Sequence, residues 1–87
     1  MPRSWVKVVR SDGGGTGDNV YVDTDYVDVG GFVGQALATD SGQHTFETLG
    51  ADDKPAWRKV ATIDPPPGNS QDDPVLVTLT PVRRRRS

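Results

Sequence analysis

The chain has 87 residues with 10 glycines, 7 prolines and no cysteine, and its formal net charge at pH 7 is -2. This length allows one domain with a thin core, because a second core would need roughly 50 residues of its own. The lack of cysteine excludes disulfides and thiolate metal sites. Valine and threonine are frequent and leucine, alanine and glutamate are scarce, which predicts an all-β protein of short strands and turns.

The charge is segregated along the chain. Without the arginines at positions 83–86, six basic residues face twelve acidic ones, so residues 1–82 carry a formal charge of -6 and the tail carries +4. No apolar run reaches the roughly 18 residues of a membrane span, and residues 1–10 lack the apolar centre of a secretory signal. We expect a soluble protein that does not act in a membrane.

The first predicted strand covers residues 5–10 (W-V-K-V-V-R), with Val6 and Val8 on one face. Residues 11–18 contain four glycines and predict a hairpin loop or a flap.

Residues 19–29 (N-V-Y-V-D-T-D-Y-V-D-V) contain the tripeptide Tyr-Val-Asp twice, five positions apart. An odd offset places Tyr21 and Tyr26 on opposite faces of a continuous strand. We therefore expect two short strands, residues 20–23 and 26–29, joined by an acidic bend. The alternative is one long edge strand with both faces half buried.

Glycines at positions 30, 31 and 34 indicate a bend or the close approach of another backbone. Asp40 and Ser41 suit the centre of a turn with Gly42 in the left-handed conformation. Residues 32–39 and 43–49 are therefore predicted to form an antiparallel hairpin, whose register stays open.

Residues 50–55 predict a second turn, and residues 56–63 a strand rather than two helical turns, because Thr62 and Ile63 close the segment and Pro65 follows. Residues 64–74 predict an extended proline-rich arm. Residues 75–82 alternate as a strand, and Pro81 suggests an edge position. The whole predicts one domain, residues 1–82, with a basic tail at 83–87. Its fold is a small antiparallel sandwich or partly open barrel of about six short strands with extended N- and C-terminal arms.

Three residue groups are candidate sites of chemistry. The first, Asp23, Asp25 and Asp28, offers oxygen ligands, but the spacing lacks the glycine and glutamate of a calcium-binding EF-hand loop. The second, Asp40, Ser41 and His44, lies on one turn without a pocket or an oxyanion hole. The sequence therefore predicts no metal, no cofactor and no enzyme.

The third group is the aromatic set Trp5, Tyr21, Tyr26 and Trp57. In so small a domain these side chains are expected to form the core. The alternative is a stacking platform for sugar rings or bases, and the acidic body argues against bases because it repels phosphates.

Partner binding is the remaining prediction. The arginine forks of the tail suit phosphates or acidic protein surfaces, and the proline arm can reach a neighbouring subunit. The predicted partner-binding residues are Arg83, Arg84, Arg85, Arg86, Asp23, Asp25, Asp28, Pro65, Pro66 and Pro67. We expect the tail of one copy to meet the three aspartates of another.

In size, composition and extended arms the chain is similar to small β-rich accessory proteins of bacteriophage particles, such as head decoration and head-completion proteins. This similarity implies a non-enzymatic module that docks on other subunits of a larger assembly, including copies of itself, in a virion or the cytoplasm. The alternatives are a nucleic-acid-associated protein that binds phosphate through the tail and a carbohydrate-binding module.

Overall fold

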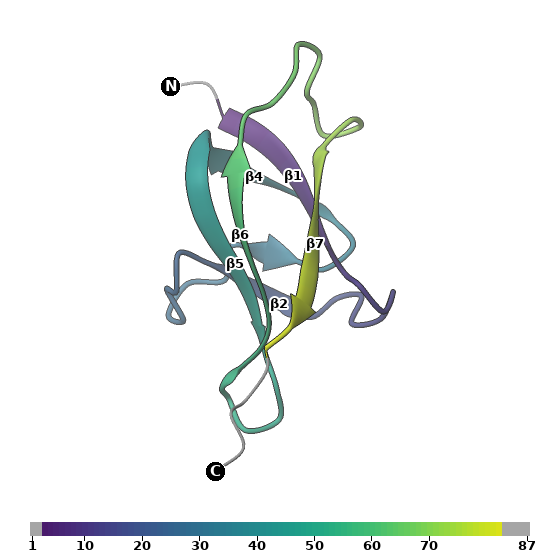
Figure 1. Cartoon of the computed structure of the whole chain (residues 1–87). Helices are drawn as coiled ribbons and strands as arrows, with labels where there is room; N and C mark the ends of the chain where they lie inside the picture. The colour runs from purple at the N-terminus through teal and green to yellow at the C-terminus, as the bar shows by residue number, and fades with distance from the viewer. Residues whose placement is uncertain (1–2, 83–87) are drawn as a thin grey trace.

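The computed structural model describes residues 3–82 and forms seven strands without a helix (Figure 1). The strands are β1 (Arg3–Arg10), β2 (Asn19–Val22), β3 (Gly31–Phe32), β4 (Ala36–Asp40), β5 (Gly42–Leu49), β6 (Pro55–Ile63) and β7 (Val75–Pro81). They form one mixed sheet in the order β3-β2-β5-β6-β7-β1-β4. The all-β class is confirmed, as are the predicted strands at residues 5–10, 56–63 and 75–82.

The sheet curls into a nearly closed barrel, so the predicted partly open barrel is confirmed. Its two edge strands, β3 and β4, lie close together without pairing and leave one seam unsealed. The approach at this seam is tight, since a Cβ atom on Gly31 would lie 2.7 Å from Cδ2 of Leu37. A glycine at position 31 therefore lets the barrel curl this far.

One strand pair was not expected from the sequence. β1 and β7 run parallel, in a register from Val6 opposite Val75 to Arg10 opposite Leu79, whereas the other pairs are antiparallel. Closure of the barrel brings the first and last strands together, and both start from the same end of the molecule (Figure 1).

The hairpin predicted around Gly42 is wrong. The chain does reverse there, and Gly42 has φ of +115°, but β4 pairs with β1 while β5 pairs with β6 and β2. The turn residues reverse the direction of the chain, but the packing of the whole barrel determines which strands pair. The glycine-rich residues 11–18 are likewise no hairpin loop, because they join β1 to β2 and these strands are not neighbours.

The edge position predicted for β7 is also wrong, because β7 lies between β6 and β1. Pro81 does not end its pairing: the register places it opposite Trp57, and the next amide, Val82 N, donates a 2.8 Å hydrogen bond to Ala56 O. A proline is tolerated where its missing N–H points away from the neighbouring strand. The predicted alternation is confirmed, with Val77 and Leu79 buried.

The core is aliphatic and mainly built of valine. Phe46 is its one aromatic member, and of the four aromatic side chains expected there only Trp57 packs against it, partly buried. The prediction of an aromatic core is therefore wrong, because the narrow barrel interior is filled by side chains of valine and leucine size. The core residues are Val6, Val8, Val20, Val33, Leu37, Phe46, Ile63, Val77 and Leu79.

Candidate interaction surfaces

The connection between β2 and β3, residues 23–30, is called the tyrosine loop below. The bend predicted in the tyrosine repeat is confirmed, since Asp23 and Thr24 both have φ of +60° and end β2. The second predicted strand, residues 26–29, is wrong, because residues 26–28 form bends and Val29 belongs to no strand. The break folds Tyr26 back so that its ring meets Tyr21 edge to face, with 5.5 Å between the ring centroids.

A buried carboxyl group anchors the tyrosine loop. The Tyr26 hydroxyl donates a 2.7 Å hydrogen bond to Oε1 of Glu47, which is only 2% exposed. Arg58 Nε lies 3.9 Å from the other oxygen of Glu47. Desolvation, together with the neighbouring Glu47, raises the pKa of Tyr26 above 10.0, so the phenol stays a donor across the physiological range.

The anchored loop presents apolar side chains to solvent. Of the six large hydrophobic side chains exposed among residues 3–82, four lie between positions 26 and 32, and Val27 is 90% exposed. The other three are Tyr26, Val29 and Phe32. Apolar side chains that gather in this way on a small protein typically mark a contact with another macromolecule.

His44, on β5, connects the end of β2 to the end of β4 through hydrogen bonds. Its Nδ1 lies 2.8 Å from Oδ2 of Asp23, and its Nε2 lies 2.7 Å from the carbonyl oxygen of Asp40. Both partners are acceptors, so only the doubly protonated imidazolium donates to both. Desolvation lowers the pKa of His44, but the hydrogen bonds to Asp23 and Asp40 outweigh it and the net shift is upward from 6.5.

The three predicted acidic contact residues differ in their environment. Asp23 is engaged with His44, and its Oδ1 also accepts a 3.1 Å hydrogen bond from Thr45 N. Asp25 accepts a 3.1 Å bond from the amide of Val27, whereas Asp28 is exposed and has no side-chain hydrogen bond or ion pair within residues 3–82. Among those residues no three acidic or histidine side chains are placed to hold a metal ion.

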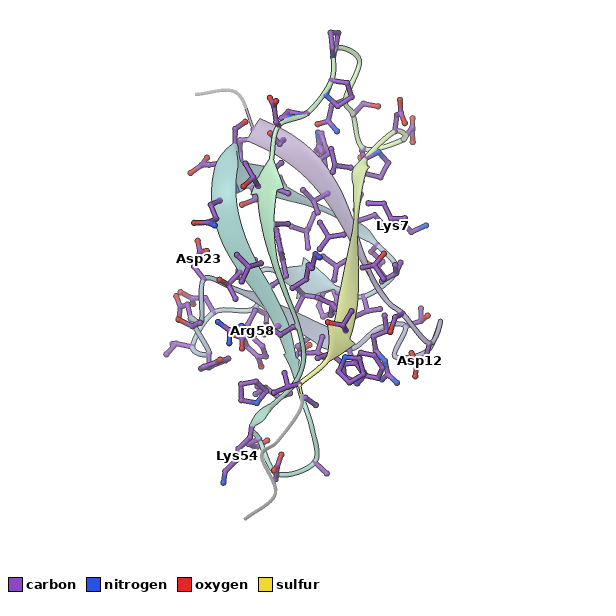
Figure 2. All side chains as sticks on the ribbon, in the orientation of Figure 1. Lys7, Asp12, Asp23, Lys54 and Arg58 are labelled. Carbon is purple, nitrogen blue, oxygen red and sulfur yellow. The ribbon has the colours of Figure 1, made fainter. Side chains whose placement is uncertain are left out.

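A second acidic group surrounds Arg10 at the other side of the barrel, where Figure 2 labels Asp12. The Arg10 guanidinium pairs with Asp12, lies 3.8 Å from Asp18 and stacks 4.2 Å above the ring of Trp57. The hydrogen bond from Arg10 lowers the pKa of Asp12. These contacts close the glycine-rich loop onto the barrel and occupy one face of Trp57.

The structure assembles neither a catalytic group from Asp40, Ser41 and His44 nor a stacking platform from the two tyrosines. Ser41 Oγ is 2.9 Å from Ser4 Oγ, and both ring nitrogens of His44 are already engaged with other residues. Tyr21 and Tyr26 meet at 65°, so this pair offers no two parallel ring faces to a sugar.

Comparison of the chain with known protein families, curated proteins and solved structures finds no match. Over residues 3–82 there is no helix that could span a membrane.

A cleft opens between β6 and β7, which pair only at their lower ends and splay above (Figure 1). The register pairs are Trp57 with Pro81 and Arg58 with Thr80. Above them lies a cleft of about 390 Å³ whose one charged lining residue is Lys59. Its other lining residues are Ala61, Thr62, Ile63, Val75, Leu76, Val77, Thr78 and Thr80.

The predicted proline arm is an irregular connection between β6 and β7 that contains Pro65, Pro66 and Pro67. It is held to the barrel, because Asn69 Oδ1 accepts a 2.7 Å bond from Trp5 N and Asn69 Nδ2 donates a 3.0 Å bond to Trp5 O. The predicted tail residues Arg83 to Arg86 lie outside the described residues, as do Met1 and Pro2.

Sequence reasoning missed the exposed valines of the tyrosine loop, the cleft and the role of His44. The sequence pattern predicts a strand for Val27 and Val29, in which one face would be covered. The one available signal was the odd tyrosine repeat, which already required a break before these valines.

Proposed function

We propose that this protein is a non-enzymatic interaction module that docks on other subunits of a larger assembly. The observation that carries the proposal is the anchored tyrosine loop, which together with Phe32 of β3 holds four large apolar side chains in solvent within seven residues. Exposing such side chains costs solubility, and the cost is offset when a partner covers them.

The anchoring distinguishes this loop from a disordered connection. The Tyr26 bond to buried Glu47 fixes the middle of the loop, and the Gly30 N bond to Val20 O, at 2.8 Å, fixes its end. A preorganised surface binds with a smaller loss of conformational entropy than a free segment. The size and β-rich composition are those of accessory proteins of bacteriophage particles, and a decoration or head-completion role in such a particle is the specific form of the proposal.

Nucleic-acid binding through Arg83 to Arg86 stays an alternative that rests on the sequence. It predicts affinity that falls steeply with salt and disappears when the four arginines are deleted. The carbohydrate alternative is weaker, because Arg10 covers one face of Trp57 and the two tyrosines are not parallel.

The test is size-exclusion chromatography with light scattering on the full chain, beside purification from the native source. We expect co-elution with a larger assembly, and we expect Val27→Asp to release the protein from it while the circular dichroism spectrum is unchanged. Val27→Asp suits this test because Val27 makes little contact with its own chain. A monomer that co-purifies with nothing would overturn the proposal.

A further inference from the structure

The two remaining exposed large hydrophobic side chains lie on β6 and β7. Leu76, 62% exposed, lines the β6–β7 cleft, and Val60, 45% exposed, lines a second hollow that shares Lys59 and Thr80 with the cleft. The exposed large hydrophobic side chains of residues 3–82 thus lie in two regions, positions 26–32 and the strands β6 and β7.

On both sides of the cleft, backbone N–H and C=O groups point toward the space that an additional strand would occupy. In an antiparallel pair, alternate residues direct both N–H and C=O toward the same neighbour. The carbonyl oxygen of Ala56 accepts a hydrogen bond from the amide of Val82, directly after β7, so the same alternation directs the peptide groups of Val60 and Thr62 toward β7. The β6–β7 register stops at Arg58, and no β7 residue pairs with Val60 or Thr62.

β7 offers the matching edge. Its pairing with Arg58 places the peptide groups of Thr80 toward β6, and by alternation those of Leu76 and Thr78 as well. An extended segment lying in the cleft would find donors and acceptors on both sides, as in recognition by strand addition.

The basic side chains at the cleft indicate what kind of segment binds there. Lys59 is register partner of buried Phe46, so its side chain lies on the inward face of β6, yet it is exposed because the cleft opens there. It has no acidic partner within residues 3–82, and Arg58 lines the lower continuation of the cleft. A segment with an acidic side chain pointing inward and apolar side chains pointing outward complements this site, whereas the arginine tail is repelled by it.

The tyrosine loop has that pattern. Residues 26–28 form bends in the isolated chain, so the segment must straighten between its anchored ends when it binds. Once it is extended, Val27 and Val29 lie on one face and Asp28 on the other, and the valines would contact Val60 and Leu76 while Asp28 meets Lys59. The loop lies beside β5, where Figure 2 labels Asp23, and the cleft faces another direction between β6 and β7. One copy therefore does not fill its own cleft.

We propose that the β6–β7 cleft receives the Val27-Asp28-Val29 segment of a second copy of this chain as an added strand. The proposal rests on the proposed function and names the partner of the tyrosine loop. Since the loop and the cleft are different surfaces, the contact is head to tail and builds rings or filaments rather than isolated pairs. Three inserted residues bury little area, so a single contact is weak and association depends on concentration.

A charge-swap experiment on the full chain tests the contact. Asp28→Lys alone places two lysines together, and Lys59→Glu alone places two acids together, so each variant should sediment as a monomer at concentrations where the wild type associates. An equimolar mixture restores an opposite-charge pair at every contact and should regain the wild-type mass distribution. A mixture that sediments as its separate components do would overturn the proposal.

Cysteine capture gives a second readout, because the native chain contains no cysteine. Val27→Cys mixed with Leu76→Cys should form a disulfide-linked heterodimer under mild oxidation in at least tenfold excess over Val27→Cys mixed with Gln71→Cys. Gln71 is exposed in the proline-rich connection and serves as the matched control. Equal yields from the two mixtures would overturn the proposal.

These outcomes separate the two proposals. If the wild type co-purifies with a larger assembly but the swap and the cross-link fail, the docking function stands and the cleft is not where a second copy binds. Rescue of Asp28→Lys by Lys59→Glu also excludes the arginine tail as the partner of Asp28, because the tail is identical in both variants.

Discussion

Tyr26 donates its hydroxyl hydrogen bond to Glu47, and this contact joins the exposed loop to the interior of the barrel. Glu47 is the only glutamate of the chain and is nearly completely buried. The carboxyl group is therefore satisfied by a residue of the loop it supports, so the order of the loop and the stability of β5 are coupled.

Tyr26→Phe should destabilise the protein by about 1–3 kcal/mol, because the buried carboxyl group of Glu47 loses its donor while the ring is retained. Urea denaturation followed by tryptophan fluorescence measures this change. Tyr21→Phe is the control, since its hydroxyl has only a 3.5 Å contact with Asn19 on the surface. Equal effects of the two substitutions would show that the Glu47 bond does not anchor the loop.

His44 should give the protein a stability that falls as the pH rises above 6.5. Its pKa is raised above 6.5 in the folded state, so its contribution is complete below pH 6.5 and disappears as the pH rises through the folded value. Asp23 acts in the opposite sense: its pKa is below 3.8 despite desolvation, because of its bonds to His44 and Thr45 N. Its contribution is present above pH 3.8 and is lost as the pH falls through the folded value.

The measurement is the melting temperature of wild type and His44→Gln from pH 5 to 9. His44 is the only histidine, and the charges that raise its pKa are those of Asp23 and Asp40. The wild type should lose stability toward pH 9 and the variant should show a flat profile. If the melting temperatures of the two proteins changed with pH in the same way, His44 would not be the source of the pH-dependent stability.

Asn69→Ala should destabilise the protein by roughly 1–2 kcal/mol, because Asn69 makes two hydrogen bonds to the backbone of Trp5. The proline-rich connection should then be cleaved faster in limited proteolysis. Gln71→Ala, an exposed position in the same connection, should stay within about 0.5 kcal/mol of wild type. Unchanged proteolysis of Asn69→Ala would mean that other contacts hold the connection in place.

Gly31→Ala tests the seam between β3 and β4. The added methyl group would lie 2.7 Å from Cδ2 and 2.8 Å from Cβ of Leu37, so the barrel must open and we expect a loss of about 1–3 kcal/mol. Gly14→Ala is the matched control, because its nearest contact would be 3.4 Å, to the end of the Arg10 side chain. A Gly31→Ala variant that is as stable as the wild type would show that β3 and β4 move apart without a loss of stability.

The sequence by itself determined the local features of this protein. Alternation marked Val6 and Val8 and then Val77 and Leu79 as inward-facing, since side-chain direction along a strand depends only on its own period of two. The turn before β6 is equally local: it is closed by the Gly50 N bond to Lys54 O at 2.9 Å. The odd tyrosine repeat located the break after β2 for the same reason.

Only the tertiary structure decided which strands pair and which side chains remain exposed to solvent. The parallel contact of β1 with β7, the separation of β4 from β5 and the splaying of β6 from β7 all depend on how seven strands close around one thin core. No local pattern encodes such long-range register. The exposure of Val27 and the unpaired position of Lys59 follow from that closure, and so does the pairing of tyrosine loop and cleft proposed here.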